Sequence, residues 1–204
     1  METIETGNLT DNALSIRIIE AAKQLFMDHG FKGTTTKMIA KEANVNEATL
    51  FRHFKNKEGI FLAITKDLTK HSNSKLESII ESDIPLEEML FQFGMELYGR
   101  IVQSKGVLIV AIIESKQRSE LVKNVTNTFR SIVEILERKL VKLHNEGALG
   151  KNDFFTVSLM YVESLIGLFI VQTRLEGDLI PMEIERLCRS ASKVLVHGLQ
   201  SNEL

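Results

Sequence analysis

Residues 38–54 read MIAKEANVNEATLFRHF, and this stretch decides the fold of the N-terminal part of the chain. Ala40 is small enough for a second helix to cross close to its own helix. Asn44 follows four positions later, and Asn tolerates the left-handed backbone conformation that a tight turn requires. The apolar residues on either side of the turn can anchor both helices to one core: Ile39, Val45 and Leu50. The spacing therefore predicts a helix-turn-helix, the motif that lays its second helix in the major groove of DNA.

The residues around this motif supply the ends of four helices. Gly30 suits the position just after a helix, and Thr34–Thr36 offer a cap for the start of the next. Asn46 and Asn56 can cap the two helices that follow. The predicted helices in this part of the chain cover residues 14–29, 37–43, 47–54 and 57–70.

The rest of the chain predicts longer helices. Pro85 and Pro181 suit first turns, whereas Gly147 and Gly177 suit helix ends. No segment alternates between apolar and polar residues for long enough to indicate a strand. The predicted helices cover residues 73–82, 85–103, 105–115, 119–146, 152–176 and 181–199. We therefore expect an all-α fold, with an N-terminal three-helix helix-turn-helix domain followed by a larger helical-bundle domain.

Composition and charge narrow the class of protein. The net charge is −2, yet residues 14–60 carry eight Lys or Arg against five Asp or Glu, so a basic excess coincides with the motif. The lone Cys188 cannot form an internal disulfide, and the first fifteen residues lack the pattern of a signal peptide. The longest apolar stretches, residues 106–113 and 164–171, are too short to span a bilayer. These features indicate a cytoplasmic protein that does not act at a membrane.

Motifs for catalysis are missing from the sequence. There is no G-x-S-x-G, no P-loop and no H-E-x-x-H, and the five histidines are scattered along the chain. We expect a protein that is not an enzyme and that needs no cofactor or metal.

Residues 17–61 carry several features in a fixed order. They are Phe26 with Gly30-Phe31, Thr34–Thr36, Ile39-Ala40, Ala43-Asn44-Val45, Thr49–Phe54 and Lys57-Glu58. In this order they resemble the N-terminal domain of the TetR family of transcriptional regulators. Two positions depart from the family pattern: Asn44 replaces the usual turn glycine, and Phe51 replaces a tyrosine whose hydroxyl contacts a phosphate. The phosphate contact is lost with that hydroxyl, although the ring of Phe51 can still pack.

The resemblance implies a set of DNA contacts. Glu47 could accept a hydrogen bond from a cytosine amino group, Ala48 could touch a thymine methyl group, and Arg52 could pair with guanine. His53 and Lys57 would contact the DNA backbone. The implied DNA-binding residues are Thr36, Lys37, Asn46, Glu47, Ala48, Thr49, Arg52, His53 and Lys57.

The resemblance also implies a homodimer that reads a palindromic operator, because one small motif covers too little DNA for tight binding. Apolar stripes on the last two predicted helices are the expected dimer interface, although such stripes could instead face the core of their own chain. The expected interface residues are Leu159, Val162, Ile166, Phe169, Leu187, Ala191, Val194 and Leu195.

A small, largely apolar effector is the remaining partner that the resemblance implies. The candidate lining residues, which could equally be ordinary core, are Phe91, Met95, Tyr98, Phe129, Met160 and Gln172. We thus expect a flexible tail over residues 1–13, a DNA-binding domain over 14–60, and an effector-binding and dimerisation domain over 61–204. The predicted function is a repressor that its effector releases from the operator. An effector-independent DNA-binding protein, whose C-terminal domain binds another protein, is the alternative.

Overall fold

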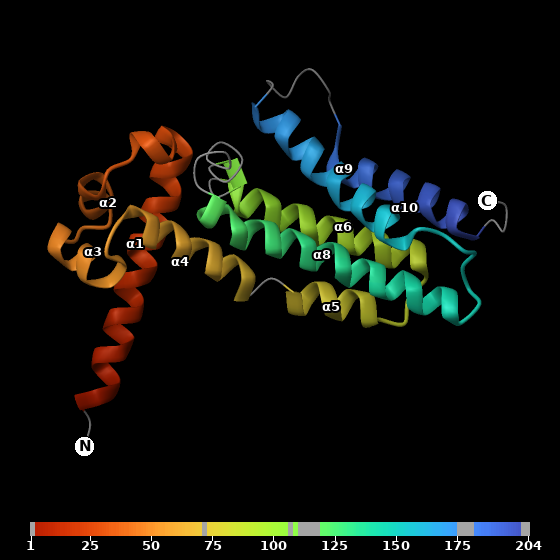
Figure 1. Cartoon of the computed structure of the whole chain (residues 1–204), viewed down its shortest axis with the longest axis horizontal. Coiled ribbons are helices and arrows are strands. Elements are labelled where there is room, and N and C mark those ends of the chain that lie inside the picture. The colour runs from red at the N-terminus through yellow and green to blue at the C-terminus, as the bar shows by residue number, and fades with distance from the viewer. Residues whose placement is uncertain (1–2, 71–72, 106–107, 110–118, 175–181, 201–204) are drawn as a thin grey trace. The chain divides into compact units, whose positions relative to one another are not determined.

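A computed structural model describes residues 3–70, 73–105, 108–109, 119–174 and 182–200. All its regular elements within these ranges are helices, which confirms the all-α fold class (Figure 1). The chain divides into two compact units, one formed by residues 1–70 and 104–126 and the other by residues 71–103 and 127–204. Most of the predicted helix 105–115 lies outside the described residues.

The first unit is built from four helices of the N-terminal part. They are α1 (Thr3–Gly33), α2 (Thr36–Glu42), α3 (Glu47–Phe54) and α4 (Lys57–Lys70). Their buried side chains include three phenylalanines whose rings meet at centroid distances between 5.2 and 6.0 Å: Phe26, Phe31 and Phe61. Such ring pairs stabilise a core by about 0.5–1.5 kcal/mol each beyond the area that they bury.

Helix α1 begins earlier than predicted, and its range continues past the predicted end at Gly30 to Gly33. It begins at Thr3, inside the residues expected to form a flexible tail, and it is kinked at Gly30, which has a φ of 68°. The buried hydroxyl of Thr34 donates to the carbonyls of Leu25 and Gly30, at 3.0 and 2.8 Å. Gly30 therefore ends the regular part of α1, as predicted, and Thr34 satisfies carbonyls that the kink would leave without partners.

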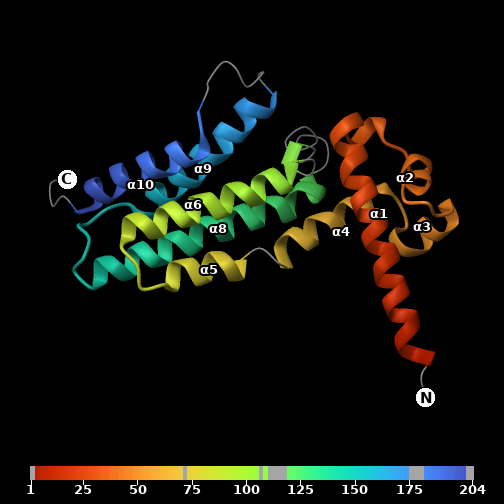
Figure 2. The same ribbon diagram turned by 180° about the vertical axis from the view of Figure 1, so that it is seen from behind.

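The second unit contains the longer helices. They are α5 (Asn73–Glu81), α6 (Leu86–Gln103), α8 (Ser119–Asn145), α9 (Phe154–Arg174) and α10 (Ile184–Gln200). Helix α6 is central, because it packs against α5, α9 and α10. From residue 127 onward, α8 runs alongside α6 in both views of the chain (Figures 1 and 2).

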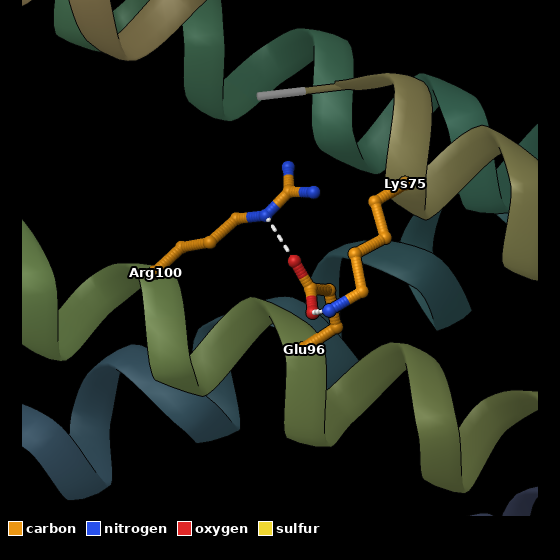
Figure 3. A network of polar contacts seen from close by, with 3 residues as sticks. All are labelled: Lys75, Glu96 and Arg100. Carbon is orange, nitrogen blue, oxygen red and sulfur yellow. Dashed lines mark hydrogen bonds and ion pairs between the residues drawn. The ribbon is translucent and has the colours of Figure 1, made fainter. Parts of the chain in front are cut away.

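Polar contacts fix α6 to its neighbours. Glu96 of α6 receives Lys75 of α5 at 2.5 Å and Arg100 of its own helix at 2.8 Å (Figure 3). Partial burial raises the pKa of Glu96, but the hydrogen bonds from the two cations outweigh it and hold the pKa below the ordinary value. Between α9 and α6, the buried hydroxyl of Tyr161 donates to the carbonyl of Leu90 at 2.7 Å.

Helix α9 is long and apolar enough, over Phe154–Thr173, to cross a membrane by length and composition alone, and it is the one such helix among the described residues. The sequence did not indicate this length, because Glu163 and the serines of the helix divide it into short apolar runs. The helix packs against α6 and buries Tyr161, Val162 and Leu165. A core helix of a bundle passes the same test, so its length does not by itself indicate a membrane span.

Candidate nucleic-acid interface

The turn between α2 and α3 has the geometry that the sequence predicts. Asn44 adopts the left-handed conformation, with a φ of 52°. The amide of Val45 donates to the carbonyl of Ala40 at 2.9 Å, which closes the turn. Ala40 and Leu50 are both buried, so the two helices meet through a small residue on one and an apolar anchor on the other. Asn44 thus performs the task of the family's usual glycine.

Side-chain caps start each of the three helices around this turn. Thr35 accepts from the amide of Met38 at 3.2 Å, and Asn46 accepts from the amide of Thr49 at 2.7 Å. Asn56 accepts from the amide of Gly59 at 2.8 Å. Each cap satisfies an amide that the first turn of a helix leaves without a partner, which contributes about 1 kcal/mol. Because its amide oxygen is used in this way, Asn46 shapes the start of α3 in addition to its predicted place at the DNA.

Helix α3 divides its side chains between the core and solvent. Leu50 is buried and Phe54 packs partly against the core of the first unit. On the other side, Ala48, Phe51 and Arg52 are exposed. Lys37 is also exposed at the start of α2. Of the predicted DNA-binding residues, Lys37, Asn46, Ala48 and Arg52 are thus exposed to solvent.

Thr36 and Glu47 contact each other in the structure. The hydroxyl of Thr36 donates to a carboxylate oxygen of Glu47 at 2.6 Å and joins the first turns of α2 and α3. The carboxylate also lies at a helix N-terminus, where negative charge is favourable. The two residues were predicted as separate DNA contacts, and their pairing was not predicted, because they lie on different helices and periodicity does not give the register between two helices.

Lys57 has a structural role that the sequence did not predict. Its ammonium donates to the carbonyls of Phe31 and Thr34, at 2.5 and 2.7 Å, and lies 4.4 Å from the centroid of the Phe31 ring. These contacts fasten the start of α4 to the end of α1 and to the segment that precedes α2. Its predicted contact with the DNA backbone stays a prediction.

The residue that ends α3 was not predicted either. Lys55 has a φ of 65°, and its amide donates to the carbonyl of Phe51 at 2.9 Å. Lysine has no preference for the left-handed conformation, so the sequence did not indicate a turn at Lys55. His53 is half-buried, and its ring centroid lies 6.2 Å from that of Phe54.

Two candidate effector residues lie in direct contact in the second unit. The hydroxyl of Tyr98 donates to the side-chain oxygen of Gln172 at 2.5 Å, and the amide nitrogen of Gln172 donates to the carbonyl of Met182 at 2.8 Å. Phe91 instead packs against Arg189, whose guanidinium carbon lies 3.9 Å from the ring centroid. Met160 is 62% exposed, so it lies on the outside of α9 rather than beside the other candidates.

The expected dimer residues do not all face outward. Val162 and Phe169 are buried within their own chain, as expected if these parts of the apolar stripes face its core. Val194 of α10 is 71% exposed. The remaining expected interface residues are half-buried: Leu159, Ile166, Leu187, Ala191 and Leu195. The stripes thus serve both the core of the unit and its surface.

Several known proteins are similar to this chain in sequence. The family model "Bacterial regulatory proteins, tetR family" matches residues 18–64. The HTH-type transcriptional regulator YvkB of Bacillus subtilis is 27% identical over 186 residues, which cover 91% of this chain and 97% of YvkB. The biofilm operon icaADBC HTH-type negative transcriptional regulator IcaR of Staphylococcus aureus is 26% identical over 150 residues, which cover 72% of this chain and 80% of IcaR.

Solved structures have the same fold. The transcriptional regulator FadR from Bacillus subtilis, in complex with stearoyl-CoA, matches 90% of this chain and 98% of its own with a TM-score of 0.73 and 22% identity. The TetR-family regulator PfmR from Thermus thermophilus matches 91% of this chain and all of its own with a TM-score of 0.69 and 20% identity. Together with the turn at Asn44 and the exposed face of α3, these findings show that residues 18–64 form a TetR-family helix-turn-helix domain and that the whole chain is similar to HTH-type transcriptional regulators.

Proposed function

We propose that the chain is a homodimeric repressor that binds a palindromic operator and is released from it by a small, largely apolar effector. The observation that carries the proposal is the left-handed turn at Asn44, which sets the exposed face of α3 beside α2. That face presents Ala48 and Arg52, whose side chains suit a thymine methyl group and a guanine edge.

Exposed apolar side chains on the last two helices support the dimer. Met160 on α9 is 62% exposed and Val194 on α10 is 71% exposed. Gly167, also exposed, would let a second helix approach α9 closely. A dimer built on this face would carry two copies of α3, which a two-fold symmetric operator requires at a spacing of about 34–36 Å.

The contact between Tyr98 and Gln172 supports an effector site in the second unit. It joins α6 to α9 through polar groups that are only partly buried. Mainly apolar binding sites commonly fix the orientation of a ligand through a few such groups. The likeness to a FadR that holds stearoyl-CoA favours a ligand with a long apolar portion.

Selection of bound duplexes from a random DNA library tests the DNA-reading part. We expect a palindromic consensus with two equal half-sites. Arg52→Ala should relax the preference at one position of each half-site by about 1–3 kcal/mol, whereas the exposed Lys41→Ala on α2 should leave base preference unchanged. A selection that returns no consensus would contradict sequence-specific recognition.

Binding measurements on the selected duplex test the effector and the dimer. A stearoyl-CoA titration should weaken DNA binding, and Tyr98→Phe should shift the concentration at which it does so. An affinity that no acyl-CoA or free fatty acid changes would favour the effector-independent alternative. Val194→Glu should lower the mass measured by light scattering from that of a dimer to that of a monomer. An unchanged dimer mass would place the interface elsewhere.

A further inference from the structure

Phe51 is an exposed aromatic residue on the helix that is proposed to read DNA. Its side chain is 45% exposed, whereas Leu50 beside it is fully buried and Phe54 packs against the core. Burial of a phenylalanine side chain ordinarily stabilises a folded protein. Leu50 and Phe54 thus contribute to the core of the first unit, whereas much of the Phe51 ring remains in contact with water.

The surroundings of Phe51 indicate what could cover it. Ala48, also exposed, lies one helical turn earlier on the same face. The exposed cations Arg52 and Lys55 border this apolar pair. The nearby carboxylate of Glu47 is held by the hydroxyl of Thr36. A partner that complements this surface would present small apolar groups to Ala48 and Phe51 and negative charge to Arg52 and Lys55.

The major groove of DNA has that chemistry. Phosphates line both of its edges, and thymine alone among the four bases presents a methyl group in it. We propose that Phe51 is a specificity-determining residue whose ring packs against the 5-methyl group of a thymine in each operator half-site. The proposal rests on the proposed function, because it requires α3 to lie in the major groove.

The ring of Phe51 then does more than fill a position where the family has tyrosine. Without a hydroxyl it cannot donate to a phosphate, so its contribution to binding comes from apolar contact. That contact discriminates among bases, since replacing the thymine removes the group that covers the ring. The proposal predicts a thymine at a fixed position of the selected consensus, near the guanine that Arg52 would read.

Single-atom changes in the DNA test the contact. In the consensus duplex selected by the wild-type protein, each thymine is replaced in turn by deoxyuridine, which removes only the methyl group. We expect an affinity loss of roughly fourfold at one thymine in one half-site, and of about 15-fold when both symmetric thymines are replaced, from the value of one buried methyl-sized group. The measurement is competition fluorescence anisotropy at constant salt.

Protein variants assign that loss to a side chain. Phe51→Ala should bind the thymine and deoxyuridine duplexes with the same, weaker affinity, so that the loss at this position disappears. Met27→Ala, a matched control for an exposed apolar side chain on α1, should keep both the affinity and the deoxyuridine effect. Thermal unfolding of each variant shows whether the fold is retained.

Three results would overturn the proposal in distinguishable ways. If no thymine is sensitive to deoxyuridine while the wild-type protein still selects a consensus, the inference about Phe51 fails and the proposed function stands. If a sensitive thymine remains sensitive in Phe51→Ala, another side chain such as Ala48 makes the contact. If no consensus is selected at all, the proposed reading of DNA fails together with this inference.

Discussion

Replacement of Lys57 by methionine separates a structural role from a DNA-binding role. The ammonium donates to two backbone carbonyls and lies over the Phe31 ring, and these contacts hold α4 to the segment that precedes α2. Methionine keeps most of the aliphatic length of lysine but has no N–H to donate. The variant would therefore leave the carbonyls of Phe31 and Thr34 without this donor.

The size of the effect follows from the contacts. A hydrogen bond from a charged donor contributes about 1.5–3 kcal/mol, and a cation over an aromatic ring adds roughly 0.5–1 kcal/mol at an exposed site. Lys57 is half-buried, so water can replace part of what is lost. We expect Lys57→Met to lower the free energy of unfolding by about 2–3 kcal/mol, which is large against a total of about 5–15 kcal/mol.

Urea unfolding followed by circular dichroism measures this loss, with Lys41→Met as the control because Lys41 is exposed on α2. The midpoint for Lys57→Met should fall while the midpoint for Lys41→Met stays within error of the wild type. Equal midpoints for all three proteins would refute the structural role. If Lys57 also contacts a phosphate, the folded variant should lose about one from the slope of log affinity against log salt.

Four further predictions follow from other parts of the structure. Asn44→Ala should destabilise the first unit by about 1–2 kcal/mol because of its φ of 52°, while Asn44→Gly should not; equal losses in urea unfolding would contradict the turn. Gly94→Ala should cost roughly 1–3 kcal/mol in the same assay, since the added methyl would lie 2.3 Å from the Tyr161 hydroxyl, and a stable variant would refute this close packing. Burial raises the pKa of the Cys188 thiol to about 11, so an aromatic disulfide reagent should modify it at about pH 8 only as fast as the protein unfolds; rapid modification of the native protein would show otherwise. Although burial raises the pKa of Glu96, hydrogen bonds from its two cations hold it lowered, so its contribution to stability is present above the ordinary Glu pKa and is lost as the pH falls through the folded value; identical acid unfolding of wild type and Glu96→Gln would contradict this.

The helices and turns of the first unit were largely predictable, because they depend on local chemistry. Asn44 adopts the left-handed turn, Asn46 caps α3 and Gly30 kinks α1, and each residue type has a strong preference for the conformation that it adopts. Lys55 shows the limit of this reasoning. Its left-handed conformation does not follow from any preference of lysine.

The contacts between residues far apart in the sequence could not be predicted in the same way. The Thr36–Glu47 hydrogen bond, the attachment of Lys57 to Phe31, and the Tyr98–Gln172 contact each join different elements. Periodicity tells which side of its own helix a residue occupies, but it does not give the register between two helices. For this reason the structure shows partners of Thr36, Glu47 and Lys57 that the sequence did not predict.

The apolar stripes of α9 and α10 illustrate a second limit. Helical spacing placed Val162 and Val194 in one predicted interface, yet the first is fully buried in its own chain and the second is 71% exposed. An apolar stripe has the same pattern whether it covers a core or meets a second subunit. Only the fold shows which residues of a stripe are buried in the core of their own chain.

Fluorescence anisotropy with the selected duplex and a scrambled duplex of equal length, over a series of salt concentrations, tests the central claim that α3 reads DNA. We predict that the selected duplex binds about 10³-fold or more tightly than the scrambled one at physiological salt. The logarithm of the affinity should fall linearly with the logarithm of the salt concentration. Equal affinity for the two duplexes at every salt concentration would contradict the claim.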